Sequence, residues 1–362
     1  MPAYLCNNMN ELTGTKNNRQ VATWLLIGVA MIVIQVLLGG ITRLTESGLS
    51  ITEWKPITGA LPPLNDAAWQ AEFEKYKDTD QFKFIHQDFS LRDFKFIFFW
   101  EWFHRLWARV MGMVFIIGFV YFLVRKKFNS KMVMPMVILF FLGAMQGAVG
   151  WIMVKSGLVP EKYFVGHIEL ATHFMAALIL LCYTLWFAMS LLPSLETKVY
   201  DGKTRGILKI ITVVLFIQLI YGAFMAGLKA AITAPTWPDI NGAFIPANAG
   251  EMSPWIQNLL DNRLMIHFIH RSLAYLLLIL VGIFYFRSGN IKGNTAFRRL
   301  RSLLGALILL QVCLGIFTVL YATNNEVFIW LGVIHQFTAM MLAMCVTGLL
   351  FIVRNVKKIA VQ

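Results

Sequence analysis

The sequence predicts an all-α integral membrane protein, in which eight transmembrane helices form two repeated four-helix bundles. Its 362 residues are 58% hydrophobic and only 14% charged, whereas soluble domains are about 25% charged. Apolar residues gather in long runs, and characteristic residues of the first half return in the second. The net charge of +13 does not indicate nucleic-acid binding, because the basic residues cluster in short loops between apolar runs, as in membrane proteins.

Eight apolar runs are each long enough to cross about 30 Å of hydrocarbon. They lie at about 22–41, 95–124, 132–154, 164–192, 207–228, 264–286, 300–321 and 328–353. Lys and Arg cluster after the second, fourth, sixth and eighth runs, which the positive-inside rule places in the cytoplasm. We therefore expect a bacterial inner-membrane protein with both termini cytoplasmic and two long periplasmic loops, 42–94 and 229–263. His86, in the first long loop, is expected to be solvated.

An internal repeat relates the first four spans to the last four. The matched pairs are Gln35 and Gln218, Gly39 and Gly222, Gln146 and Gln311, Gly150 and Gly315, His104 and His270, and His173 and His335. The loop segment Trp54–Ala60 likewise matches Trp237–Ala243. An even number of crossings gives both copies the same topology, so we assign the two bundles to residues 1–195 and 196–362. The glutamines are expected to link neighbouring helices by hydrogen bonds.

Four histidines at matching positions predict a cofactor in each bundle. They are His104, His173, His270 and His335, one on each even-numbered span, about seven to ten residues from its outer end. At 1.5 Å per residue they share a depth of about 10–15 Å. Two imidazoles per bundle supply the axial pair of one haem iron, although pairs could also form across the halves. Zinc and copper accept imidazole too, but they need further ligands, and neither bundle has an intramembrane Cys or Asp near its pair.

Charged residues distinguish the two halves. Glu101 lies three residues before His104, so the two share a helix face, and its counterpart in the second half is His267. A carboxylate beside only one iron predicts chemistry there, either as a proton acceptor or by stabilising developing positive charge. A structural pair with Arg105 is the alternative. Arg105 and its counterpart Arg271 are expected to pair with haem propionates.

Three segments resemble haem A synthase. They are Gly39–Thr45 with Ser47–Ser50, Trp54–Pro63 and Glu101–Arg109. The resemblance covers nearly the whole chain, from about Trp24 to Phe351. It is strongest to the branch shared by proteobacteria and mitochondria, because members from Gram-positive bacteria carry a cysteine pair in the outer loops and this chain has none there.

The resemblance implies that a ring methyl of haem O is oxidised to the formyl group of haem A, for cytochrome oxidases of the haem-copper class. It implies a b-type haem held by His270 and His335, and substrate haem held by His104 and His173. Haem O synthase is the implied upstream partner and cytochrome oxidase assembly the downstream acceptor. An electron donor is a further implied partner, and the sequence is compatible with a homo-oligomer.

Two other functions fit parts of the pattern. A non-catalytic di-haem b-type cytochrome relaying electrons from quinol needs the same four histidines, but it needs no carboxylate beside one iron only, so Glu101 separates the two hypotheses. A haem or solute transporter would need broken helices and midplane polar sites, whereas the prolines here lie mostly in loops or at span ends.

Overall fold

The computed structural model describes residues 2–53, 58–192 and 198–354, and these residues are predominantly helical. Within them, eight helices are long and apolar enough to cross a membrane, which confirms the predicted fold class. These are α1 (Pro2–Leu44), α4 (Leu91–Val124), α5 (Ser130–Gly157), α6 (His167–Ser190), α7 (Gly202–Gly227), α8 (Arg263–Arg287), α9 (Thr295–Leu320) and α10 (Asn325–Ile352). The helix α1 begins at Pro2, well before the predicted span at about 22–41. The part of α1 that is compatible with a membrane is Lys16–Leu44.

Short polar side chains fix where these helices begin. Ser90 starts α4 with a capping box, in which its side chain and that of Asp93 bond reciprocally to the backbone. Asn129, Asp201 and Asn262 cap α5, α7 and α8 in the same way, through side-chain oxygens that accept from backbone N–H groups. Because the helices are apolar on all sides beyond these caps, they suit a membrane rather than an aqueous surface.

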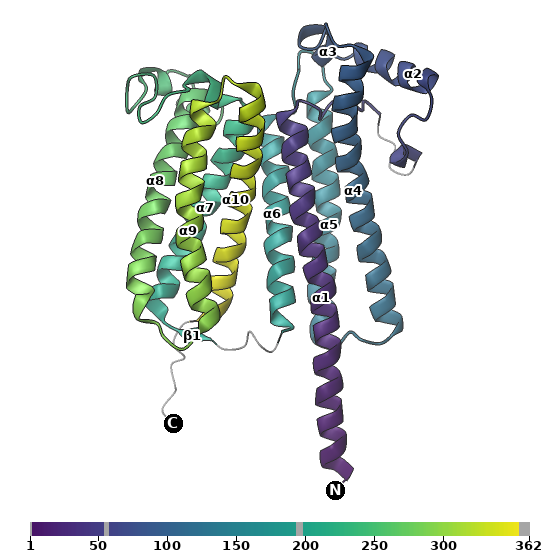
Figure 1. The fold of residues 1–362 in the computed structure, drawn as a ribbon, viewed down its shortest axis with the longest axis vertical. Coiled ribbons are helices and arrows are strands. Elements are labelled where there is room, and N and C mark those ends of the chain that lie inside the picture. Colours follow the sequence, from purple (N-terminus) through teal and green to yellow (C-terminus); the bar gives the residue numbers. More distant parts are fainter. Residues whose placement is uncertain (1, 54–57, 193–197, 355–362) are drawn as a thin grey trace.

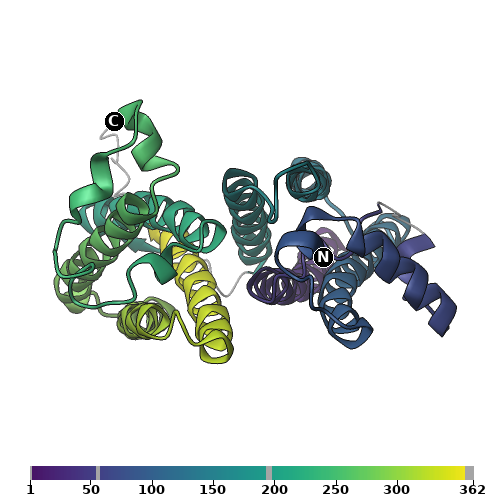
Figure 2. The ribbon, with the colours of Figure 1, turned by 90° about the horizontal axis from the view of Figure 1, so that it is seen from above.

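The helices pack as two groups of four that stand side by side (Figure 1). The first bundle contains α1, α4, α5 and α6, and the second contains α7 to α10; the view from above separates them clearly (Figure 2). The bundles meet where α6 packs on α7 and α10, and where α1 packs on α10. The predicted boundary at 195/196 lies within residues 193–197, outside the described part of the chain.

Short elements close the two ends of the bundles. At one end β1 (Val199–Tyr200) pairs in parallel with β2 (Val353–Arg354). At the other end lie α2 (Asp66–Lys77), α3 (Asp80–Phe84) and the 3-10 turns η1 (Thr58–Ala60), η3 (Ala230–Thr233), η4 (Ala247–Gly250) and η5 (Trp255–Leu259). A last turn, η6 (Ser288–Asn290), follows α8. We call the segment 58–90, with α2 and α3, the outer cap.

An aromatic cluster seats the outer cap on the first bundle. Phe73 and Tyr76 of α2 are buried against Phe94, Ile97 and Phe98 in the first turns of α4. The ring centroids of Phe73 and Phe94 are 5.0 Å apart, and those of Tyr76 and Phe94 are 5.3 Å apart. Aromatic burial of this kind dominates packing energies, so the cap is firmly joined to the helix that carries Glu101 and His104.

Candidate functional site

Each of the four paired histidines contacts a glutamine on a neighbouring helix. Nε2 of Gln35 lies 3.1 Å from His104 Nε2. The distance is 3.2 Å from Gln146 Nε2 to His173 Nδ1, 3.4 Å from Gln218 Nε2 to His270 Nε2, and 3.2 Å from Gln311 Nε2 to His335 Nε2. The repeat therefore conserves a physical unit, in which a glutamine on an odd-numbered span orients a histidine on the next one. The expectation that the glutamines link helices is confirmed.

A glycine one helical turn after each glutamine makes room for the imidazole ring. A Cβ added at Gly150 would lie 2.7 Å from His173 Cε1. At Gly39, Gly222 and Gly315 the corresponding distances to the neighbouring histidine Cε1 are 3.1, 3.2 and 3.1 Å. A side chain here would displace the ring, so these glycines are required by close approach rather than by helix packing alone. The sequence carried this signal as a glutamine and a glycine four residues apart, but it did not show that both contact a histidine.

The histidines come together in pairs, one pair in each bundle. His104 and His173 lie on α4 and α6 of the first bundle, and His270 and His335 lie on α8 and α10 of the second. All four line one cavity of about 1100 Å³, which continues from the first bundle into the second. Small-molecule pockets usually measure about 300–1000 Å³, so this cavity is large enough for ligands of considerable size. No hydrogen bond among the described residues joins a histidine of one half to a histidine of the other.

The donor set fits haem. Oε1 of all four glutamines is buried without a partner among the described residues, as is Nδ1 of His270 and of His335. An iron takes one ring nitrogen of each histidine, and a glutamine amide can turn its oxygen toward the other N–H, as outer partners of metal ligands commonly do. Among the described residues no group of three or more His, Cys, Asp and Glu side chains could hold a metal ion by itself. The residues present therefore fit a haem that two histidines would hold.

Glu101 is buried, with 3% of its surface exposed, and both of its oxygens are engaged. Oε2 accepts from Ser50 Oγ at 2.7 Å and from the backbone N–H of Ile51 at 2.8 Å. Oε1 accepts from Arg105 Nη2 at 2.5 Å. The structural pair with Arg105 is therefore present, and Glu101 also lines the cavity beside His104. The two interpretations of Glu101 are thus compatible in geometry.

Arg105 and Arg271 hold equivalent turns of the two long loops. Arg105 donates to the carbonyls of Ile51 at 3.1 Å and Glu53 at 3.4 Å. Arg271 donates to the carbonyl of Thr236, the counterpart of Glu53, at 2.6 Å. Its Nε also donates to His267 Nε2 at 3.0 Å, as Arg105 donates to Glu101. The sequence did not predict this role, because the acceptors are backbone carbonyls of distant residues, and any residue type can supply a backbone carbonyl. Trp54–Ile57 of the repeated loop motif lies outside the described residues.

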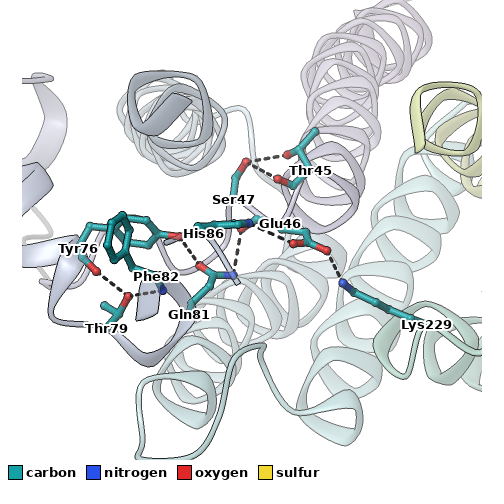
Figure 3. Close-up of polar contacts among 9 residues, drawn as sticks. All are labelled: Thr45, Glu46, Ser47, Tyr76, Thr79, Gln81, Phe82, His86 and Lys229. Carbon is teal, nitrogen blue, oxygen red and sulfur yellow. Dashed lines mark hydrogen bonds and ion pairs between the residues drawn. The ribbon is translucent and has the colours of Figure 1, made fainter. Parts of the chain in front are cut away.

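One prediction about the first long loop is wrong. His86 was expected to be solvated, but it is only 6% exposed. Its ring stacks on Phe89 at a centroid distance of 3.9 Å, and its nitrogens face Tyr76 and Glu46 (Figure 3). The sequence could not show this burial, because it depends on the fold of the outer cap around His86 and on Glu46, which lies 40 residues earlier.

Comparison with known proteins identifies the family. A family model described as a cytochrome oxidase assembly protein, COX15-CtaA, matches residues 22–347. A heme A synthase of Flavobacterium psychrophilum is 41% identical over 334 residues, which cover 90% of this chain and 96% of that protein. A heme A synthase of Bradyrhizobium sp. (strain ORS 278) is 42% identical, over 92% of this chain and 91% of that protein. One of Nitrosospira multiformis is 38% identical, over 90% of each. The match extends over both bundles and all four histidines, and the chain belongs to the COX15-CtaA family of cytochrome oxidase assembly proteins.

Proposed function

We propose that this integral membrane protein is a haem A synthase, an oxidoreductase that converts the ring methyl of haem O to the formyl group of haem A. Its relatives of about 40% identity bear this name, and its family serves cytochrome oxidase assembly. The observation that carries the proposal is the pair of histidine sites with one carboxylate. Each bundle presents two glutamine-held histidines, and within the described part of the chain only the first bundle adds a buried glutamate beside them.

The second bundle is the site for a resident b-type haem. His270 and His335 would hold its iron, and Gln218 and Gln311 would orient the two rings. Such a haem supplies one-electron redox chemistry when bound. Arg271 is engaged with the loop carbonyls and His267, so pairing with a propionate would use the donors that remain.

The first bundle is the site for haem O and haem A. His104 and His173 would hold the substrate, with Gln35 and Gln146 behind them. Arg105 pairs with Glu101 and would meet a propionate only with its remaining donors. Oxidation of a methyl group releases protons, and Glu101 is the carboxylate that lines the cavity next to His104. We assign Glu101 the task of taking up a proton or stabilising positive charge at the reacting carbon.

The protein would lie in a bacterial inner membrane with its termini in the cytoplasm. The charge pattern of the loops supports this orientation, and the described ends of the chain lie opposite the outer cap. Haem O synthase would deliver the substrate, and cytochrome oxidase assembly would receive the product. Reporter fusions near Asn129 and Gly202 should be cytoplasmic, and periplasmic signals at both sites would refute the orientation.

Haem extraction from the purified protein tests the proposed function. Cells that also make haem O should yield protein with b-type haem together with haem O or haem A. The control is the double variant His104→Ala/His173→Ala, which should retain b-type haem and lose the other. Wild-type protein with b-type haem in both bundles, and no haem O or A under any supply, would favour an electron-relaying cytochrome instead.

A further inference from the structure

Glu46 and Lys229 occupy equivalent positions of the two halves, and they meet each other at the outer end of the molecule. The offset between them is the one that relates Gln35 to Gln218. Both backbones are left-handed, with φ of 57° and 51°, which costs about 1–2 kcal/mol for a residue other than glycine. The Lys229 ammonium donates to Glu46 Oε1 in an ion pair (Figure 3). The carboxylate of the first half is thus paired with the ammonium group at the equivalent position of the second half.

On one side, Glu46 is tied into the outer cap. His86 Nε2 lies 3.2 Å from the second carboxylate oxygen, and Gln81 Nε2 donates to the Glu46 carbonyl at 3.2 Å. The Tyr76 hydroxyl donates to Gln81 Oε1 at 3.0 Å and lies 2.7 Å from His86 Nδ1, which completes the network in Figure 3. Burial raises the pKa of the Glu46 carboxyl, but the hydrogen bonds from His86 and Lys229 outweigh it and hold the pKa at about 2. Glu46 is therefore ionised at any physiological pH.

On the other side, Lys229 lies directly after the end of α7 and contacts a residue of the first half. Its ammonium lies 3.9 Å from the ring centroid of Phe164, in a cation–π contact. Arg43, one turn before Glu46, donates to the carbonyls of Ala226 at 2.7 Å and Gly227 at 3.1 Å. These are among the last carbonyls of α7, where a cation is favoured by the helix dipole. Arg43 therefore joins the end of α1 to the end of α7, and Lys229, just after α7, contacts the segment that precedes α6.

The ion pair lies between the two turns that the arginines hold. The first turn, 51–53, follows Glu46 and is bonded to Arg105, which directly follows His104. The second turn, 234–236, follows Lys229 and is bonded to Arg271, which directly follows His270. Glu46 and Lys229 also line the cavity that contains the histidines. A continuous set of bonds thus runs from one histidine helix to the other through this pair.

We propose that Glu46 and Lys229 are positioning residues for the reaction, because their ion pair joins the outer cap of the first bundle to the second bundle and fixes the relation of the two histidine sites. The role rests on the proposed function, in which the first bundle holds the substrate haem and the second holds a resident haem that would transfer single electrons between the substrate site and the electron donor. The rate of that transfer depends on the separation of the two groups, and small misplacements can cost large factors in rate.

The test combines a distance measurement with turnover. Spin labels are placed at Asp66 of the cap and Glu251 of the second long loop, both exposed, in a chain whose four cysteines are replaced by alanine. Glu46→Gln and Lys229→Gln should each broaden the label-to-label distance distribution and lower the rate of haem A formation about tenfold. The b-type spectrum should remain, which shows that the variants are folded.

Two controls make the result decisive. The charge exchange Glu46→Lys/Lys229→Glu should restore a narrow distribution and most of the rate. Glu74→Gln removes a cap carboxylate that pairs at 2.8 Å with Lys77 inside α2, and should change neither reading. A narrow distribution in both single variants, or a broad one with an unchanged rate, would overturn the proposal. Wild-type protein that forms no haem A would refute the proposed function, while the distances would still decide whether the pair joins the bundles.

Discussion

In the first bundle the arginine after His104 bonds to a carboxylate, Glu101, whereas in the second bundle the arginine after His270 bonds to an imidazole, His267. Both arginines also hold carbonyls of equivalent loop turns. Both copies thus contain the histidine, the arginine and the loop turn. They differ in the side chain that accepts a hydrogen bond from the arginine, which is Glu101 in the first bundle and His267 in the second. Under the proposed function, this single difference would give one copy of the frame a different chemistry while both copies keep their two histidines.

The bundles also differ in how tightly they close. In the second bundle α8 packs against α9, whereas their counterparts α4 and α5 make few contacts with each other. Gly112, Gly143 and Gly147 line the cavity on α4 and α5, and a Cβ added at any of them would meet nothing within 4 Å. A site that exchanges substrate and product needs such room, while a site for a resident cofactor does not.

Removing a histidine should have the largest effect, namely the loss of one haem and not the other. His270→Ala or His335→Ala should abolish the b-type spectrum, because one axial ligand is lost, while His104→Ala and His173→Ala should leave it intact. Reduced-minus-oxidised spectra of the purified variants, at matched protein levels, make the measurement. Loss of both haems from a single substitution would mean that ligand pairs form across the halves, for instance His104 with His335.

Crowding one histidine should have a smaller effect, confined to one bundle. Gly150→Ala places a Cβ 2.7 Å from His173 Cε1, and such overpacking costs about 1–3 kcal/mol. We expect about tenfold less haem O or A bound and an unchanged b-type signal. Gly282→Ala, in α8, is the control, because its Cβ meets nothing within 4 Å and Gly282 does not line the cavity. Equal loss in both variants would show that the ring contact is irrelevant.

Changing the arginines should have the smallest effect on stability and on haem A yield, and the effect on yield should differ between the two bundles. Lysine keeps the charge, but its three N–H donors share one nitrogen and cannot reproduce the planar fork by which the guanidinium reaches separate acceptors. Arg105→Lys and Arg271→Lys should each destabilise the protein by about 1–3 kcal/mol, seen as similar falls in thermal melting. Only Arg105→Lys should also lower the yield of haem A severalfold, because only its acceptor is Glu101. An equal fall in yield for both would assign the arginines a purely structural task.

The sequence predicted the parts of this protein that depend on local composition and on the repeat. Apolar runs gave the eight helices, and matched residues paired His104 with His270 and His173 with His335. Glu101 stood out because a carboxylate in an apolar run is costly unless it is bonded. Each of these signals lies within one element or recurs at a constant offset.

Contacts between distant loops and helices could not be predicted in this way. Arg105 donates to the backbone carbonyls of Ile51 and Glu53. Because every residue has a backbone carbonyl, the sequence does not indicate which residues accept these bonds. His86 is buried by a cap whose fold depends on aromatic packing across the loop. Glu46 and Lys229 are of opposite charge. A search for identical residues at equivalent positions of the two halves therefore does not find this pair, although the two side chains form an ion pair.

The most direct test of the central claim compares Glu101→Gln with His267→Gln, the same substitution at equivalent positions. Haems are extracted from both purified variants, and the amounts of b-type haem, haem O, its alcohol and haem A are measured. We predict that Glu101→Gln retains both haems but loses most haem A, with haem O or the alcohol in its place, while His267→Gln still forms haem A. A normal yield of haem A from Glu101→Gln, at unchanged protein level, would contradict the account.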